Sequence, residues 1–121
     1  MKIDKFLNQL VESSGKRGSL SLCNPVELPN GKILKGRTFR ADYSSLEEMR
    51  ENFLKIRNFL LSYGFIQNYR CFIPQSQSYY LNFSSRSELF YHVGDPCPFG
   101  HELTFSIEIQ LFFEDEEVKE C

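Results

Sequence analysis

The sequence predicts a single α+β domain: an antiparallel sheet of four to six strands, one long amphipathic helix on one face, and a short N-terminal helix. Two segments carry this prediction. Apolar residues recur at steps of three and four over about 45–63, which is typical of an amphipathic helix. Apolar and polar residues alternate over 103–113, which is typical of a strand with one buried face. Because 121 residues suit one domain of ordinary size, we expect residues 1–121 to share one core.

Both helices have recognisable ends. The short helix is expected over 2–13, where apolar residues recur at helical spacing before Gly15. Ser44 or Ser45 can cap the long helix, while a glutamate three residues later reaches back to the free backbone N–H groups. Gly64 supplies the left-handed residue that commonly ends a helix.

The strands are expected on both sides of the long helix. Residues 20–23 alternate like a short strand that Pro25 ends. The pair Asn30-Gly31 favours a tight hairpin, because both residues accept a positive φ, and residues 32–41 form the return strand. The chain after the long helix is expected to form an antiparallel meander with strands at about 66–73, 78–83 and 88–93, followed by the strand at 103–113.

Charge is unevenly distributed along the chain. Residues 1–60 contain eleven Lys and Arg against seven Asp and Glu, whereas residues 61–121 contain three against nine. The net charge of −2 argues neither for nor against a nucleic-acid partner. The acidic run at the end predicts a flexible, solvated tail over 114–121.

The compartment is inferred from hydropathy and cysteine usage. No apolar run approaches the roughly 18 residues that cross a bilayer, and the N-terminus lacks the apolar core of a signal peptide. We therefore expect a cytoplasmic protein with no membrane partner. The four cysteines are widely spaced and contain no CxxC pair, so we expect reduced thiols; they are Cys23, Cys71, Cys97 and Cys121.

One group of basic residues is a candidate binding site for nucleic acid or a protein partner. It falls within 25 residues that contain a single acid, Glu27, and comprises Lys16, Arg17, Lys32, Lys35, Arg37 and Arg40. The alternative is a hairpin whose lysines protect a sheet edge from unwanted pairing. Tyr79 and Tyr80 lie in a Tyr- and Ser-rich stretch typical of recognition surfaces. As neighbours in a strand they face opposite ways, so we expect one ring to be exposed.

A second group concentrates metal-binding and nucleophilic side chains. His92, Cys97 and His101 are suitable zinc ligands, with Cys71 available as a fourth. The same residues permit a thiol enzyme with Cys97 as nucleophile and a histidine as base. The spacing matches no metal motif, however, and the prolines and glycines of 92–102 are typical of a turn.

The sequence contains no phosphate-binding loop, nucleophile elbow or zinc-protease motif, which favours a protein without catalytic activity. We therefore expect a small non-enzymatic binding or accessory module, of inhibitor or adaptor type, that acts by surface contact with a protein partner and needs no cofactor. The alternatives are a nucleic-acid-binding domain that uses the basic hairpin and a zinc or thiol protein that uses His92, Cys97 and His101. The sequence does not determine the oligomeric state.

Overall fold

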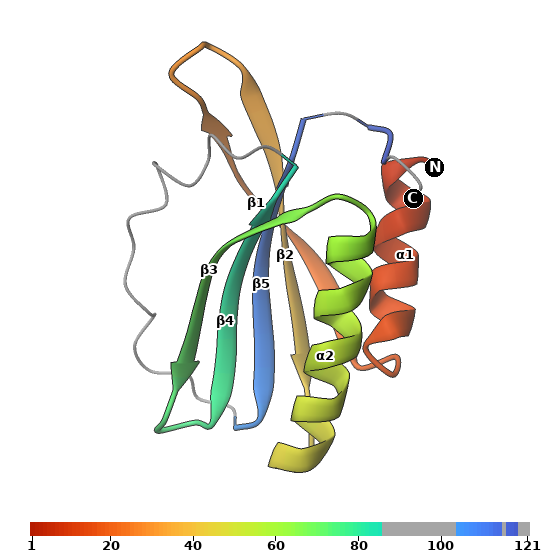
Figure 1. Cartoon of the computed structure of the whole chain (residues 1–121), viewed down its shortest axis with the longest axis vertical. Helices are drawn as coiled ribbons and strands as arrows, with labels where there is room; N and C mark the ends of the chain where they lie inside the picture. Colours follow the sequence, from red (N-terminus) through yellow and green to blue (C-terminus); the bar gives the residue numbers. More distant parts are fainter. Residues whose placement is uncertain (86–103, 115, 119–121) are drawn as a thin grey trace.

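The computed structural model describes residues 1–85, 104–114 and 116–118. Figure 1 shows a sheet with both helices on one side of it. The elements are α1 (Ile3–Ser13), β1 (Gly18–Glu27), β2 (Ile33–Asp42), α2 (Leu46–Ser62), β3 (Ile66–Ile73), β4 (Ser78–Ser84) and β5 (Ser106–Phe113). The predicted α+β class is confirmed. Among the described residues, no helix is long and apolar enough to cross a membrane.

The strands lie in the order β1-β2-β5-β4-β3. Every neighbouring pair is antiparallel except β4 and β5, which are parallel. This parallel pair departs from the expected antiparallel meander. A parallel pair needs a long connection that returns the chain to the same end of the sheet, and the stretch between Ser84 and Ser106 is long enough. The strand expected at 88–93 lies outside the described residues.

The predicted hairpin forms between β1 and β2. Pro25 does not end β1, because the register shifts between Cys23 and Val26 and accommodates the proline in an irregularity of the pairing. In the turn, Gly31 has φ of 87°, whereas Asn30 does not adopt a positive φ. The hairpin is therefore confirmed, but its turn uses one left-handed residue instead of two.

The helix ends match the sequence signals. Ser45 caps α2 by accepting a hydrogen bond from the backbone N–H of Glu48 at 3.1 Å. At the other end, Gly64 has φ of 84°, and the N–H of Phe65 donates to the carbonyl of Leu60 at 3.2 Å. These bonds satisfy backbone groups that a helix end leaves free, so α2 begins and ends within one residue of its predicted limits.

The core lies between the two helices and one face of the sheet. The ring of Phe6 from α1 stacks on Phe59 and Phe65, with 5.1 Å between centroids in each case. The predicted apolar faces of α2 and β5 supply much of the rest, namely Met49, Phe53, Ile56, Leu60, Ile107, Ile109, Leu111 and Phe113. Burial of these side chains is the main force that holds the helices on the sheet.

The expected alternation over 103–113 begins later than predicted. Phe105 has φ of 55°, which a bulky residue rarely adopts, and β5 starts at Ser106. Both backbone groups of Phe105 are used: its N–H donates to Ser76, and its carbonyl accepts from the N–H of Tyr43. These two bonds hold the chain in a bend where the sequence predicted an extended strand.

The acidic C-terminal segment is packed as far as Val118, which differs from the flexible tail expected over 114–121. Val118 is only 7% exposed and joins the core. Its N–H donates to the carbonyl of Met1, and the N–H of Ile3 donates to Glu116, both at 2.7 Å. One apolar side chain and these backbone bonds suffice to anchor a segment that charge alone would leave in solvent. Residues 115 and 119–121 lie outside the described part of the chain.

Candidate functional site

The basic residues singled out in the sequence do not gather in one patch. Arg17 precedes the pair Gly18–Ala41 at one end of the β1–β2 hairpin, and Lys32 lies in the turn at the other end. The 10 residues of β1 separate these ends, or about 30 Å at the usual rise per residue. The hairpin also divides the group between its two faces. Arg37 lies on the helix side, where its guanidinium sits over the ring of Phe113, and Arg40 lies on the opposite side.

Most of these basic side chains already have a partner within the chain. Arg37 lies 5.5 Å from the ring centroid of Phe113. The ion pairs are Arg17–Glu48 at 3.4 Å, Lys32–Glu114 at 2.9 Å, Lys35–Glu116 at 2.8 Å and Arg40–Asp42 at 3.3 Å. The hydrogen bond and charge of Lys35 lower the pKa of Glu116. Carboxylates therefore offset the positive charge of these basic residues, and two of them, Glu114 and Glu116, come from the C-terminal segment.

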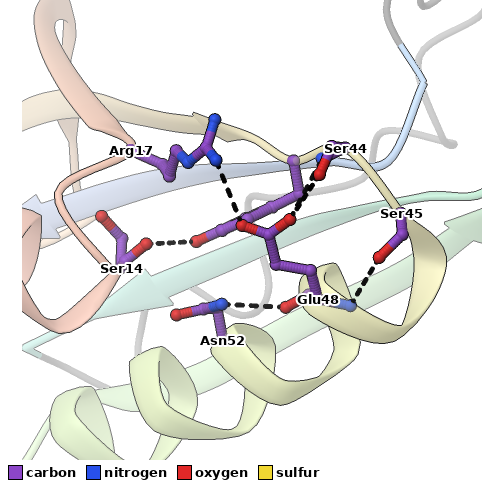
Figure 2. A network of polar contacts seen from close by, with 7 residues as sticks. Ser14, Arg17, Ser44, Ser45, Glu48 and Asn52 are labelled. Atoms are coloured by element: carbon purple, nitrogen blue, oxygen red, sulfur yellow. Dashed lines mark hydrogen bonds and ion pairs between the residues drawn. The ribbon is translucent and has the colours of Figure 1, made fainter.

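A polar network joins the start of β1 to the start of α2 (Figure 2). The carboxylate of Glu48 accepts a hydrogen bond from the Ser44 hydroxyl at 2.6 Å and pairs with Arg17. The Ser44 hydroxyl is the main reason that the pKa of Glu48 is lowered, and Arg17 acts in the same direction. Asn52 donates to the carbonyl of Glu48 at 2.9 Å. This network explains the local role of Arg17, which links β1 to the capped end of α2.

Tyr43 forms a second link in the same region. Its hydroxyl donates to the carbonyl of Ser14 at 2.8 Å, and burial raises its pKa to about 12. Gly18, the first residue of β1, also lies close to Ser14. A Cβ on Gly18 would lie 2.3 Å from the ring of Phe39 and 2.9 Å from the hydroxyl of Ser14. The start of β1 is therefore held against the core so tightly that no side chain fits.

The two adjacent tyrosines face opposite ways, as predicted, but neither ring is freely exposed. Tyr79 stacks on Phe53 at 4.2 Å on the helix side. Tyr80, 9% exposed, meets the ring of Tyr69 on the other side, with 6.2 Å between centroids. Because β4 lies inside the sheet between β3 and β5, its side chains have neighbours on both sides. The tyrosines therefore contribute to packing rather than to an open recognition surface.

Buried polar side chains line the face of β4 that points away from the helices. The Asn68 amide donates to Asn82 at 3.0 Å and to Ser84 at 2.9 Å. Asn68 Oδ1 and Asn82 Nδ2 are buried and have no hydrogen-bond partner among the described residues. Leaving such groups unpaired costs free energy, so this cluster lowers stability relative to a fully paired one.

The first six residues of β1 form an edge that sequence reasoning missed. Gly18–Cys23 pair regularly with Ala41–Gly36 of β2, and no described strand pairs with their other side. The segment contains no charge, no proline and no bulge. Leu22 is 78% exposed, and Ser19 and Ser21 are exposed as well. Charges, prolines and bulges usually protect the edges of natural sheets. Because Gly18–Cys23 has none of them, this edge is open to pairing with another strand.

The predicted zinc ligands His92, Cys97 and His101 lie outside the described residues, so the metal site stays a prediction. In the described part of the chain, no group of three or more metal-binding residues is found. Cys71 is disulfide-bonded, whereas Cys23 is free. The expectation of reduced thiols is therefore wrong for Cys71, because sequence spacing cannot show which sulfur atoms meet in the fold. As a disulfide, Cys71 is not available as the fourth zinc ligand.

No protein-family model, curated protein sequence or solved structure matches this chain, so its function has to be inferred from its own surface.

Proposed function

We propose that the chain is a non-enzymatic binding module, of inhibitor or adaptor type, that acts by surface contact with a protein partner. The observation that carries this proposal is the open edge Gly18–Cys23 of β1. An unprotected sheet edge tends to pair with other chains, and proteins normally block such pairing. The open edge of β1 is therefore best explained as a surface that binds a strand of a partner.

The chemistry of the edge defines the kind of partner segment that fits. An extended segment added to β1 gains main-chain hydrogen bonds, and its alternate side chains give specificity. On the helix side it would cover Leu22, the most exposed large apolar side chain in the described part of the chain. On the other side it would meet Ser19 and Ser21. The matching segment has apolar residues at alternate positions and small polar residues between them.

The structure offers less support for the nucleic-acid alternative. A nucleic-acid site needs cationic side chains free to neutralise phosphates. Arg17, Lys32, Lys35 and Arg40 are in ion pairs with carboxylates of the same chain, and Arg37 packs on Phe113. Binding of a phosphate backbone would have to compete with these contacts. An uncharged edge with an exposed leucine suits a protein partner better.

An affinity capture with matched variants tests the proposal. The full chain is used as bait in an extract of its native host, as wild type, as Leu22→Glu and as Leu54→Glu. A charge at position 22 blocks strand addition, and glutamate suits the fold because Arg37 lies opposite. Leu54, on α2, is 56% exposed and receives the same chemical change away from the edge.

We expect quantitative mass spectrometry to recover a protein with the wild type and with Leu54→Glu, and about tenfold less of it with Leu22→Glu. Equal recovery with all three baits would show that the edge is not the binding surface. If the wild type retains no protein, including a second copy of the chain, the proposal fails.

A further inference from the structure

We infer that the partner which the β1 edge binds is a second copy of this chain, joined by antiparallel pairing of the two β1 strands around a two-fold axis at Ser21. This inference rests on the proposed function, because it names the partner of the same edge. Two-fold dimers are the commonest homo-oligomers, and their interface patch must be complementary to itself. The segment Gly18–Cys23 meets that requirement on both faces of the sheet.

On the helix side, the two-fold axis pairs leucine with leucine. Within the hairpin, Leu20 lies opposite Phe39 and Leu22 opposite Arg37, so both leucines point to the helix side. With Ser21 opposite Ser21, Leu20 of each copy lies opposite Leu22 of the other. Directly opposed apolar side chains stabilise an antiparallel pair. The pairing therefore covers the exposed Leu22 of both copies at once.

On the other side of the sheet, the same pairing brings together small side chains. Ser21 meets Ser21, and Ser19 meets Cys23, so no charge is placed opposite another charge. The irregularity that begins after Cys23 limits regular pairing to about this segment.

Neighbouring registers fit less well. An axis at Leu20 or at Leu22 forms a single leucine pair instead of two. An axis at Cys23 places the proline of the irregular part, Pro25, opposite Ser21, where it has no N–H to donate. The axis at Ser21 is the one that uses both leucines and avoids the proline. Another protein's strand would then have to compete with self-pairing for the same edge.

A cysteine placed on the two-fold axis tests this register. Opposed residues in an antiparallel pair have Cα atoms about 4.5–5.5 Å apart, within the range that a disulfide spans. The substitution Ser21→Cys is therefore expected to give a covalent dimer under mild oxidation, about tenfold faster than Ser62→Cys. Ser62 is an exposed serine at the end of α2 and serves as the matched control. Adding Leu22→Glu to Ser21→Cys should abolish the faster crosslinking.

Sedimentation velocity over a range of protein concentrations completes the test. Wild type and Leu54→Glu should show a monomer–dimer equilibrium that Leu22→Glu shifts to monomer. A wild type that stays monomeric, or a dimer that persists in Leu22→Glu, would overturn the inference. If the wild type is monomeric but loses a captured host protein on Leu22→Glu, self-pairing fails while the proposed function stands.

Discussion

The two edges of the sheet differ in how they are protected. At the β3 edge, Arg70 is exposed, the register shifts between Gln67 and Tyr69, and Cys71 is disulfide-bonded. Charges and bulges are common means of blocking strand addition. The segment Gly18–Cys23 at the β1 edge has neither. In β1 the irregularity, Pro25 and Glu27 come only after Cys23. Among the described strands, the sheet therefore has one blocked edge and one edge with an open stretch of six residues, which locates the candidate interface on the hairpin.

The difference does not follow from exposed apolar surface alone. At the β3 edge, Ile66 is 39% and Phe72 37% exposed, so apolar side chains reach solvent there too. What separates the edges is the regularity of the backbone and the absence of charge along six residues of β1. A backbone that stays extended and regular can offer its N–H and C=O groups to a second strand in order.

The largest expected effect concerns the disulfide on the blocked edge. Cys71→Ser should lower the free energy of unfolding by about 2–4 kcal/mol, because it removes a crosslink that restricts the unfolded chain. The free thiol Cys23 on β1 is the control, and Cys23→Ser should cost much less. Urea unfolding of both variants and of the reduced wild type measures the difference. Equal losses for the two substitutions would show that the disulfide does not stabilise the β3 edge.

A smaller effect is expected at the start of the open edge. Gly18→Ala places a Cβ 2.3 Å from the ring of Phe39, so the ring or β1 has to move. Overpacking of this kind costs about 1–3 kcal/mol. The neighbouring exposed Ser19→Ala should stay within about 0.5 kcal/mol of wild type. If urea unfolding gives the same free energy for both variants, β1 is held less tightly against Phe39 than the structure shows.

The smallest expected effect is a dependence of stability on pH at the join between β1 and α2. The folded state lowers the pKa of Glu48 below its ordinary value of 4.5, mainly through the Ser44 hydroxyl. The resulting stabilisation is present above pH 4.5 and is lost as the pH falls through the lowered folded-state value. Glu48→Gln should therefore flatten the fall of unfolding free energy in acid. The exposed Glu47→Gln is the control, and an equal slope in both variants would contradict this role for Glu48.

Local signals predicted the helices and the faces of the main strands. The limits of α2 follow from its apolar repeat, the cap at Ser45 and Gly64, all of which act within a few residues. The alternation of β5 identified its buried face for the same reason. The parallel pairing of β4 and β5 was not predicted, because strand order depends on how distant segments meet.

The candidate site was predicted less well than the fold. Lys32 and Lys35 were correctly placed on the hairpin. Their ion pairs to Glu114 and Glu116, however, join residues that are 82 and 81 positions apart in the chain. Periodicity and local charge contain no information on such pairs. The uncharged run at Gly18–Cys23 is visible in the sequence. It indicates a binding surface only once β1 is known to lie at an edge of the sheet. The cytoplasmic location stays a prediction.

The sequence by itself determined the elements: where the helices begin and end, which strand faces are apolar, and that one hairpin carries four of the six candidate basic residues. These properties depend on neighbours within a turn of helix or a few residues of strand. Only the tertiary structure decided which charges neutralise one another and which strand lies at an open edge. Those outcomes depend on contacts between residues far apart in the chain, and a sheet has an edge only after all its strands have paired.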